Sequence, residues 1–155
     1  MNSRKNHGIR LAVFVFMPGL LLTLVVPAAA DTHYVSPGQS IQAAINASSN
    51  GDKIEVAPGT YNEAINFNGK AVRLYSNGGP VVTTIDATGL SSSVVRCGSG
   101  EDANTVLEGF TITGGNATLG GGMHNYSTSP TVNNCTFRGN TAGDHGGGMC
   151  NLHWQ

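Results

Sequence analysis

The sequence predicts an all-β fold, a parallel β-helix solenoid with a short N-terminal helical cap. Two nearly identical runs, GGGMHN at 120–125 and GGGMCN at 146–151, recur 26 positions apart. Short segments in which apolar and polar residues alternate occur along the chain, and turns rich in Gly and Asn join them. Self-similarity at a period in the twenties is typical of a solenoid, in which each repeat forms one coil.

The residues that flank the glycine runs support the same period. Phe110 aligns with Cys135, and Ile112 aligns with Phe137, each at an offset of 25 positions. Helical repeats need about 33 or more residues per unit, and the regular leucine frame of leucine-rich repeats is absent. Short β-strands joined by turns are therefore the better interpretation of the repeat.

The alternating segments predict strands with one face inside the solenoid and the other in water. These segments are 54–56, 65–67, 72–74, 110–112 and 135–137. Gly and Asn between them tolerate positive φ and turn the chain sharply. A domain over residues 31–155, divided by the repeat period, contains about five coils.

The stretch before the first strand has a different pattern. Ile41, Ala44 and Ile45 recur at helical spacing, Ser40 is a suitable N-cap, and Asn50-Gly51 is a suitable stop. Since the end of a coil stack exposes apolar surface, we expect residues 40–47 to form a helix that covers it.

Residues 1–30 have the pattern of a secretory signal peptide. A positive start precedes an apolar run over 11–26, and Ala28-Ala29-Ala30 supplies small residues for cleavage before Asp31. The alternative is a membrane anchor, but Pro18-Gly19 interrupts the run, which is shorter than the ~20 apolar residues of a spanning helix. We expect an exported protein, extracellular or on the outer cell surface, with no membrane span after the signal.

The charge of the predicted mature chain argues against nucleic acid as a partner. Residues 31–155 contain five basic and nine acidic residues, so their net charge is −4. Basic residues do not cluster and are not interleaved with aromatic residues, as they are in nucleic-acid-binding proteins.

Two stretches of the sequence resemble known β-helix families. The opening from SIQAAINASSNGDKIEVAPGTY at 40–61 to residue 89 resembles the first coils of pectin-lyase-like proteins. Phe137-Arg138-Gly139-Asn140 and Gly147-Gly148-Met149 resemble the FxxN and GGA-[ILV] halves of the repeat in polymorphic outer membrane proteins, with Gly replacing Ala. The resemblance implies a right-handed coil, but many activities occur on this scaffold.

The sequence contains no evident catalytic cluster, and the catalytic residues stay unknown. Catalytic carboxylates must converge, whereas the acidic residues here are scattered along the chain. Adjacent Glu101 and Asp102 are expected to be solvated loop charges that point apart. The resemblance to pectin methylesterases ends before their catalytic region. Arg138 is the only candidate lyase base in a repeat, and we expect it to point into solvent.

No metal or cofactor is predicted for this chain. His145, Cys150 and His153 are metal-ligand residue types, but their spacing matches no familiar site. A Ca²⁺ site is expected only in coils that this sequence lacks. The odd number of cysteines excludes a closed disulfide framework, and spacing cannot choose a pair among Cys97, Cys135 and Cys150.

Two functions are compatible with these patterns. The first is a structural, adhesive or glycan-binding repeat protein whose partners are polysaccharides or cell-surface proteins. The alternative is the N-terminal part of a polysaccharide lyase, pectinesterase or glycoside hydrolase. Because the pattern stops at LHWQ (152–155) without a second cap, we expect a truncated chain with an incomplete C-terminal end, no catalytic activity and a tendency toward edge-to-edge association.

Overall fold

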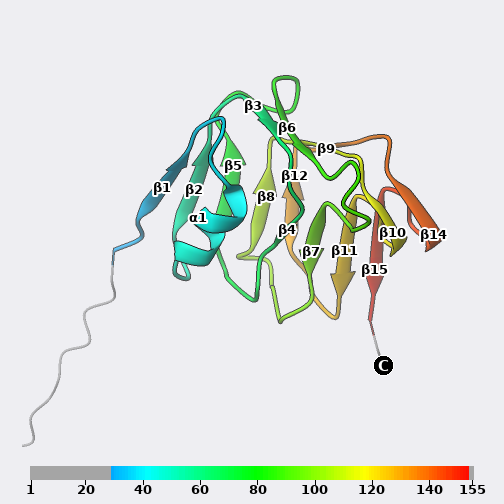
Figure 1. The fold of residues 1–155 in the computed structure, drawn as a ribbon. Coiled ribbons are helices and arrows are strands. Elements are labelled where there is room, and N and C mark those ends of the chain that lie inside the picture. Colours follow the sequence, from blue (N-terminus) through cyan, green and yellow to red (C-terminus); the bar gives the residue numbers. More distant parts are fainter. Residues whose placement is uncertain (1–28, 154–155) are drawn as a thin grey trace, which may run out of the picture.

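The computed structural model describes residues 29–153 and folds them as a stack of parallel β-strand coils (Figure 1). Only one short helix interrupts the strands in this part of the chain. The predicted all-β parallel solenoid is therefore confirmed. Residues 1–28 of the predicted signal peptide lie outside the described residues.

The strands form three long sheets and one short sheet, and every strand pair is parallel. Sheet A contains β1 (Thr32–Val35), β2 (Lys53–Val56), β5 (Arg73–Ser76), β8 (Val106–Glu108) and β12 (Thr131–Asn133). Sheet B contains β3 (Gly59–Tyr61), β6 (Thr83–Asp86), β9 (Thr111–Thr113) and β13 (Thr136–Phe137). Sheet C contains β4 (Ile65–Asn66), β7 (Val95–Cys97), β11 (Met123–Tyr126) and β15 (Met149–Leu152). Sheet D contains β10 (Asn116–Leu119) and β14 (Thr141–His145).

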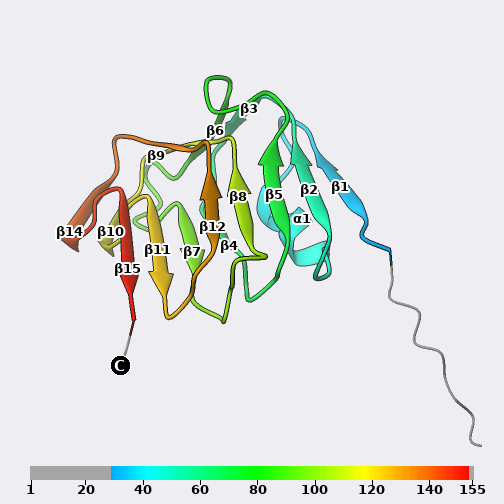
Figure 2. The ribbon, with the colours of Figure 1, turned by 180° about the vertical axis from the view of Figure 1, so that it is seen from behind.

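Each coil adds one strand to each long sheet, so the five strands of sheet A correspond to about five turns (Figure 2). The register confirms the repeat that the sequence predicts. Thr111 pairs with Thr136 at an offset of 25, and Met123 pairs with Met149 at an offset of 26.

The glycine runs lie at close contacts between coils. The N–H of Gly122 donates to the carbonyl of Gly147 at 2.9 Å, and the N–H of Val95 donates to the carbonyl of Gly122 at 3.0 Å. A Cβ at Gly122 would collide with the carbonyl oxygen of Gly148, and Gly120 has φ +58. Only glycine fits such a close backbone approach, so these runs are parts of the stack and not flexible loops.

The core consists of side chains stacked in columns along the solenoid axis. In each sheet, residues that are in register on the inner face come from successive coils. The columns are Ile54, Leu74 and Leu107 in sheet A, Tyr61, Ile85 and Ile112 in sheet B, and Ile65, Val95 and Met123 in sheet C, all of them buried. Phe137 and Met149 continue two of the columns and are partly buried.

The helix α1 (Ile41–Ala47) lies against the first coil, and Ile41 and Ile45 are fully buried. Ser40 is the N-cap, and its hydroxyl accepts a 3.1 Å hydrogen bond from the N–H of Ala43. The predicted helical cap over 40–47 is thus confirmed, although α1 ends before Asn50-Gly51.

Candidate functional site

A row of polar side chains lies on the outer face of sheet C. Asn66 of β4, Arg96 of β7, His124 of β11 and Cys150 of β15 are in register across the four strands. Their preceding neighbours in the first three strands point into the core, and side chains alternate along a strand. Asn66, Arg96 and His124 therefore face away from the core, whereas Cys150 is buried.

Two hollows lie along this row and share two lining residues. One has a volume of about 230 Å³ and is lined by Ser91–Ser93, Arg96, Ala117–Leu119 and His124. The other has a volume of about 340 Å³ and is lined by Asn66, Arg96, Cys97, Gly98, Ser99, His124 and Tyr126. Because Arg96 and His124 line both, we treat the two hollows as one feature, the sheet C groove.

Arg96 is exposed, and its guanidinium makes no ion pair or hydrogen bond with a side chain or backbone group of residues 29–153. Arg73 is different, since it pairs with Glu108 at 2.8 Å and lies over the ring of Tyr75. A guanidinium presents five donors in a planar fork that suits carboxylate and other oxygen ligands. Arg96 is therefore available to a ligand in the groove.

His124 lies beside Arg96 with an unused ring nitrogen. Its Nε2 is buried and has no hydrogen-bond partner in the described part of the chain. Burial lowers the pKa of His124 below the ordinary value of 6.5, and the positive charge of Arg96 lowers it further. The ring is therefore neutral near pH 7, so that one nitrogen can donate and the other can accept.

An aromatic ring borders the groove on the same strand. Tyr126 is 42% exposed and forms an edge-to-face contact with His124, with 6.5 Å between ring centroids. Such a ring adds an aromatic surface to the edge of the groove. The groove thus combines a cation, a neutral imidazole, an amide and an aromatic ring.

The predicted solvated position of Glu101 is wrong. Glu101 is only 3% exposed, and its carboxylate accepts 2.8 Å hydrogen bonds from the N–H groups of Gly69 and Ser99. Unpaired loop amides on two coils need an acceptor, and the carboxylate satisfies both. Asp102 is exposed and binds Asn104 instead, so the two adjacent carboxylates do not form one site.

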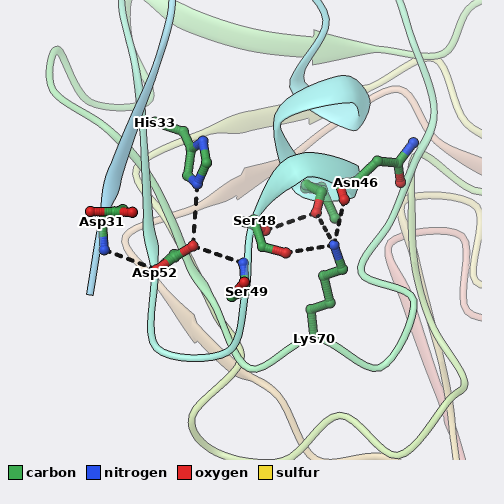
Figure 3. Close-up of polar contacts among 8 residues, drawn as sticks. Asp31, His33, Asn46, Ser48, Ser49, Asp52 and Lys70 are labelled. Atoms are coloured by element: carbon green, nitrogen blue, oxygen red, sulfur yellow. Dashed lines mark hydrogen bonds and ion pairs between the residues drawn. The ribbon is translucent and has the colours of Figure 1, made fainter. Parts of the chain in front are cut away.

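A second polar cluster lies where the first two coils begin (Figure 3). Asp52 accepts hydrogen bonds from the backbone N–H groups of Ser49 at 2.7 Å and Asp31 at 2.9 Å, and Nε2 of His33 lies 3.2 Å away. These two N–H groups, followed by His33, lower the pKa of Asp52. The carboxylate is thus held ionised at the start of β2.

Lys70 closes the helix end of the same cluster. Its Nζ donates 2.7 Å hydrogen bonds to the backbone carbonyls of Ile45, Asn46 and Ser48 (Figure 3). These carbonyls carry the partial negative charge of the helix C-terminus, which a cation stabilises. The role of Lys70 is to attach α1 to the second coil.

His145, Cys150 and His153, the residues of metal-ligand type near the end of the sequence, do not form a cluster. His145 is exposed and lies 3.0 Å from Asp144, His153 is exposed, and Cys150 is buried. Among residues 29–153, no three His, Cys, Asp or Glu side chains are grouped as metal ligands are.

The three cysteines are free thiols in the structure. Cys97 is buried and Cys135 is partly buried. Burial raises the pKa of both thiols, so neither is a reactive thiolate at neutral pH.

Two further predictions concern the exposure of Arg138 and the absence of a membrane-spanning helix after the signal. Arg138 is exposed, as predicted, and does not line the sheet C groove. No helix within residues 29–153 has the length and apolar character needed to cross a membrane.

Comparisons of the chain with protein-family models, curated proteins and solved structures find no match. The resemblance to pectin-lyase-like proteins and polymorphic outer membrane proteins therefore stays a prediction. The class that the fold and the site define is a parallel β-solenoid with a polar groove on the outer face of one sheet.

Proposed function

We propose that this protein is an exported β-solenoid that binds acidic polysaccharide through the sheet C groove and acts as a surface or extracellular binding protein. The observation that carries the proposal is the exposed guanidinium of Arg96, which lines both hollows of the groove and has no ion pair or hydrogen bond within residues 29–153. Ligand sites typically place a few unsatisfied polar groups in a concave surface.

The chemistry of the groove suits a sugar chain with carboxylate groups. Arg96 supplies charge-assisted donors for a carboxylate, which bind about twice as strongly as neutral ones. Asn66 and His124 can each donate to and accept from hydroxyl groups. The exposed ring of Tyr126 offers a flat surface on which the C–H face of a sugar can pack.

Export and family are part of the same proposal. The charged start, apolar run and alanine-rich end of residues 1–30 support secretion. The resemblance of residues 40–89 to the opening coils of pectin-lyase-like proteins supports a right-handed coil and a polysaccharide ligand. An acidic polysaccharide at the cell surface would meet an exported protein of this kind.

The test is equilibrium binding of the purified protein to polygalacturonate, alginate and a neutral glucan. We expect binding to the two acidic polymers, and a loss of about tenfold or more in affinity, ~1.4 kcal/mol, for Arg96→Ala. Arg138→Ala is the matched control, because Arg138 is also exposed but lies outside the groove. Equal binding by both variants would contradict the proposal.

The enzymatic alternative is tested with the same material. The residues that line the groove include no Asp or Glu, so no observation favours a hydrolase or lyase. Incubation with pectin, polygalacturonate and alginate, with and without Ca²⁺, should give no products. Product formation would replace the binding role by an enzymatic one.

A further inference from the structure

The backbone nitrogen of Asp31 lies 2.9 Å from Oδ1 of Asp52 (Figure 3). The Asp52 side chain is only 10% exposed. Its two oxygens have different partners, since Oδ2 accepts from Ser49 and lies near His33, whereas Oδ1 accepts from Asp31. One carboxylate oxygen is thus directed at the nitrogen of a single residue, which directly precedes β1.

Asp31 is also the first residue of the predicted mature chain. Hydrolysis of the Ala30–Asp31 peptide bond by a signal peptidase adds water across that bond. The hydroxyl goes to the carbonyl carbon of Ala30, which leaves as a carboxylate, and the nitrogen of Asp31 becomes an amine. At neutral pH this α-amine takes up a proton, because its ordinary pKa is about 7.7 to 8.0.

We propose that Asp52 is the receptor for the new N-terminal ammonium, so that signal cleavage replaces a neutral hydrogen bond by a partly buried ion pair. This inference rests on the proposed export of the protein. The peptide N–H and the ammonium occupy the same place, so cleavage changes the charge of the donor without requiring the backbone to move.

The surrounding contacts hold the two groups in place. The N–H of Lys53 donates to the carbonyl of Asp31 at 2.9 Å, and β1 then pairs with β2 in register from Thr32 and Lys53 onward. The N–H of Ser49 and the ring of His33 fix the carboxylate of Asp52 from the other side. An ammonium at Asp31 therefore meets a carboxylate that is already oriented and ionised.

The charged groups around the pair determine its pH dependence. His33 on β1 and Lys53 on β2 are the neighbouring bases, and the carboxylate of Asp31 itself is the neighbouring acid. An opposite charge within hydrogen-bond distance favours the charged form of an amine, so the α-amino pKa is raised. The resulting stability is complete below the ordinary α-amino pKa and is lost as pH rises through the raised pKa.

The experiment uses protein recovered after export, with its N-terminus established by sequencing. The α-amino pKa of Asp31 is then measured by NMR titration in the wild type, in Asp52→Asn and in Asp102→Asn. We expect a pKa about one unit above the ordinary range in the wild type and in the Asp102→Asn control, and an ordinary pKa in Asp52→Asn. Asp102 is the matched control because it is exposed.

A second variant leaves the carboxylate in place, since Asp52→Asn also alters the contacts with Ser49 and His33. One alanine inserted between Ala30 and Asp31, and shown by sequencing to be the new N-terminal residue, moves the ammonium away from Asp52 without changing any residue of the cluster. We expect this variant to have an ordinary α-amino pKa. Its urea midpoint should be lower than that of the wild type at pH 7 and equal to it near about pH 10.

Several outcomes would overturn the inference. An α-amino pKa that is the same in all variants shows that Asp52 does not receive the ammonium, even if the protein is exported and binds polysaccharide. A sequenced N-terminus other than Asp31 removes the group itself. Failure of polysaccharide binding with a raised α-amino pKa would contradict only the proposed ligand of the groove.

Discussion

Asn125 donates a 2.7 Å hydrogen bond from Nδ2 to Oδ1 of Asn151, which occupies the same position one coil later. Asn125 is only 4% exposed whereas Asn151 is exposed, and the two amides form a short polar ladder along sheet C. The position one coil earlier is Cys97, and Oδ1 of Asn125 has no partner among the described residues. Asn125 and Asn151 each lie two positions after a GGGM run, and their hydrogen bond joins two successive coils.

Replacement of Asn125 by alanine should destabilise the protein by about 1 kcal/mol, because the hydrogen bond to the exposed Asn151 is lost. The measurement is the urea unfolding midpoint. Asn62→Ala serves as the control, since Asn62 is exposed. Equal midpoints for the two variants would show that the ladder contributes nothing to stability.

Gly122→Ala should be among the most damaging single substitutions, because the new Cβ would collide with the backbone of Gly148 and with Asn140 and Phe137. We expect a loss of about 2 kcal/mol or more in the free energy of unfolding. Gly98→Ala is the matched control, since a Cβ there meets only the Cβ of Tyr126 at an ordinary distance of 3.7 Å. If both variants unfold at the same denaturant concentration, the close packing of the glycine run is not what requires glycine.

Stability should fall as pH falls through about 6.5, because the unfolded chain protonates His124 more readily than the folded chain does. The folded pKa of His124 is lowered, so the folded state binds fewer protons in this range. NMR titration should place the midpoint of His124 below 6.5, and Arg96→Ala should raise it. A midpoint at or above 6.5 would contradict the burial of this ring.

Phe137→Lys should reduce concentration-dependent self-association, which light scattering after size exclusion can measure. Within residues 29–153, β12, β13, β14 and β15 are the last strands of their sheets. None of these four strands contains Lys, Arg or Pro, the residues that commonly protect an edge. Val81→Lys is the control, because Val81 is 93% exposed elsewhere. A wild type that is monomeric at every concentration would contradict this prediction.

Much of the fold follows from the repeat, because strict periodicity leaves few ways to stack the coils. The equivalence of His124 and Cys150, predicted from the glycine runs, is confirmed by their register. The earlier coils lack this regularity, since Val106 follows Arg73 by 33 positions and Met123 follows Val95 by 28. Strands β7 and β8 were therefore not predictable from the period.

The sequence indicates the sheet C groove far less clearly than it indicates the fold. Arg96 and His124 come from coils with an irregular offset, and neither belongs to a motif that indicates binding. Within residues 29–153, Arg96 has no acceptor and Nε2 of His124 has no hydrogen-bond partner, and only coordinates can establish that. The one available signal was Arg96 itself, a charged residue inside the apolar segment SVVRC (93–97).

One side chain at the N-terminal end of the solenoid pairs with a strand as a neighbouring strand would. At the N-terminal end, the side-chain amide of Gln42 accepts from the N–H of Asn66 at 2.6 Å and donates to its carbonyl at 3.1 Å, as another strand would. In a linear array of coils, stability depends on nearest neighbours, and opening begins at the weaker end. Gln42 takes the place of a preceding strand for Asn66, so hydrogen exchange should be slower at β4 than in a Gln42→Ala variant.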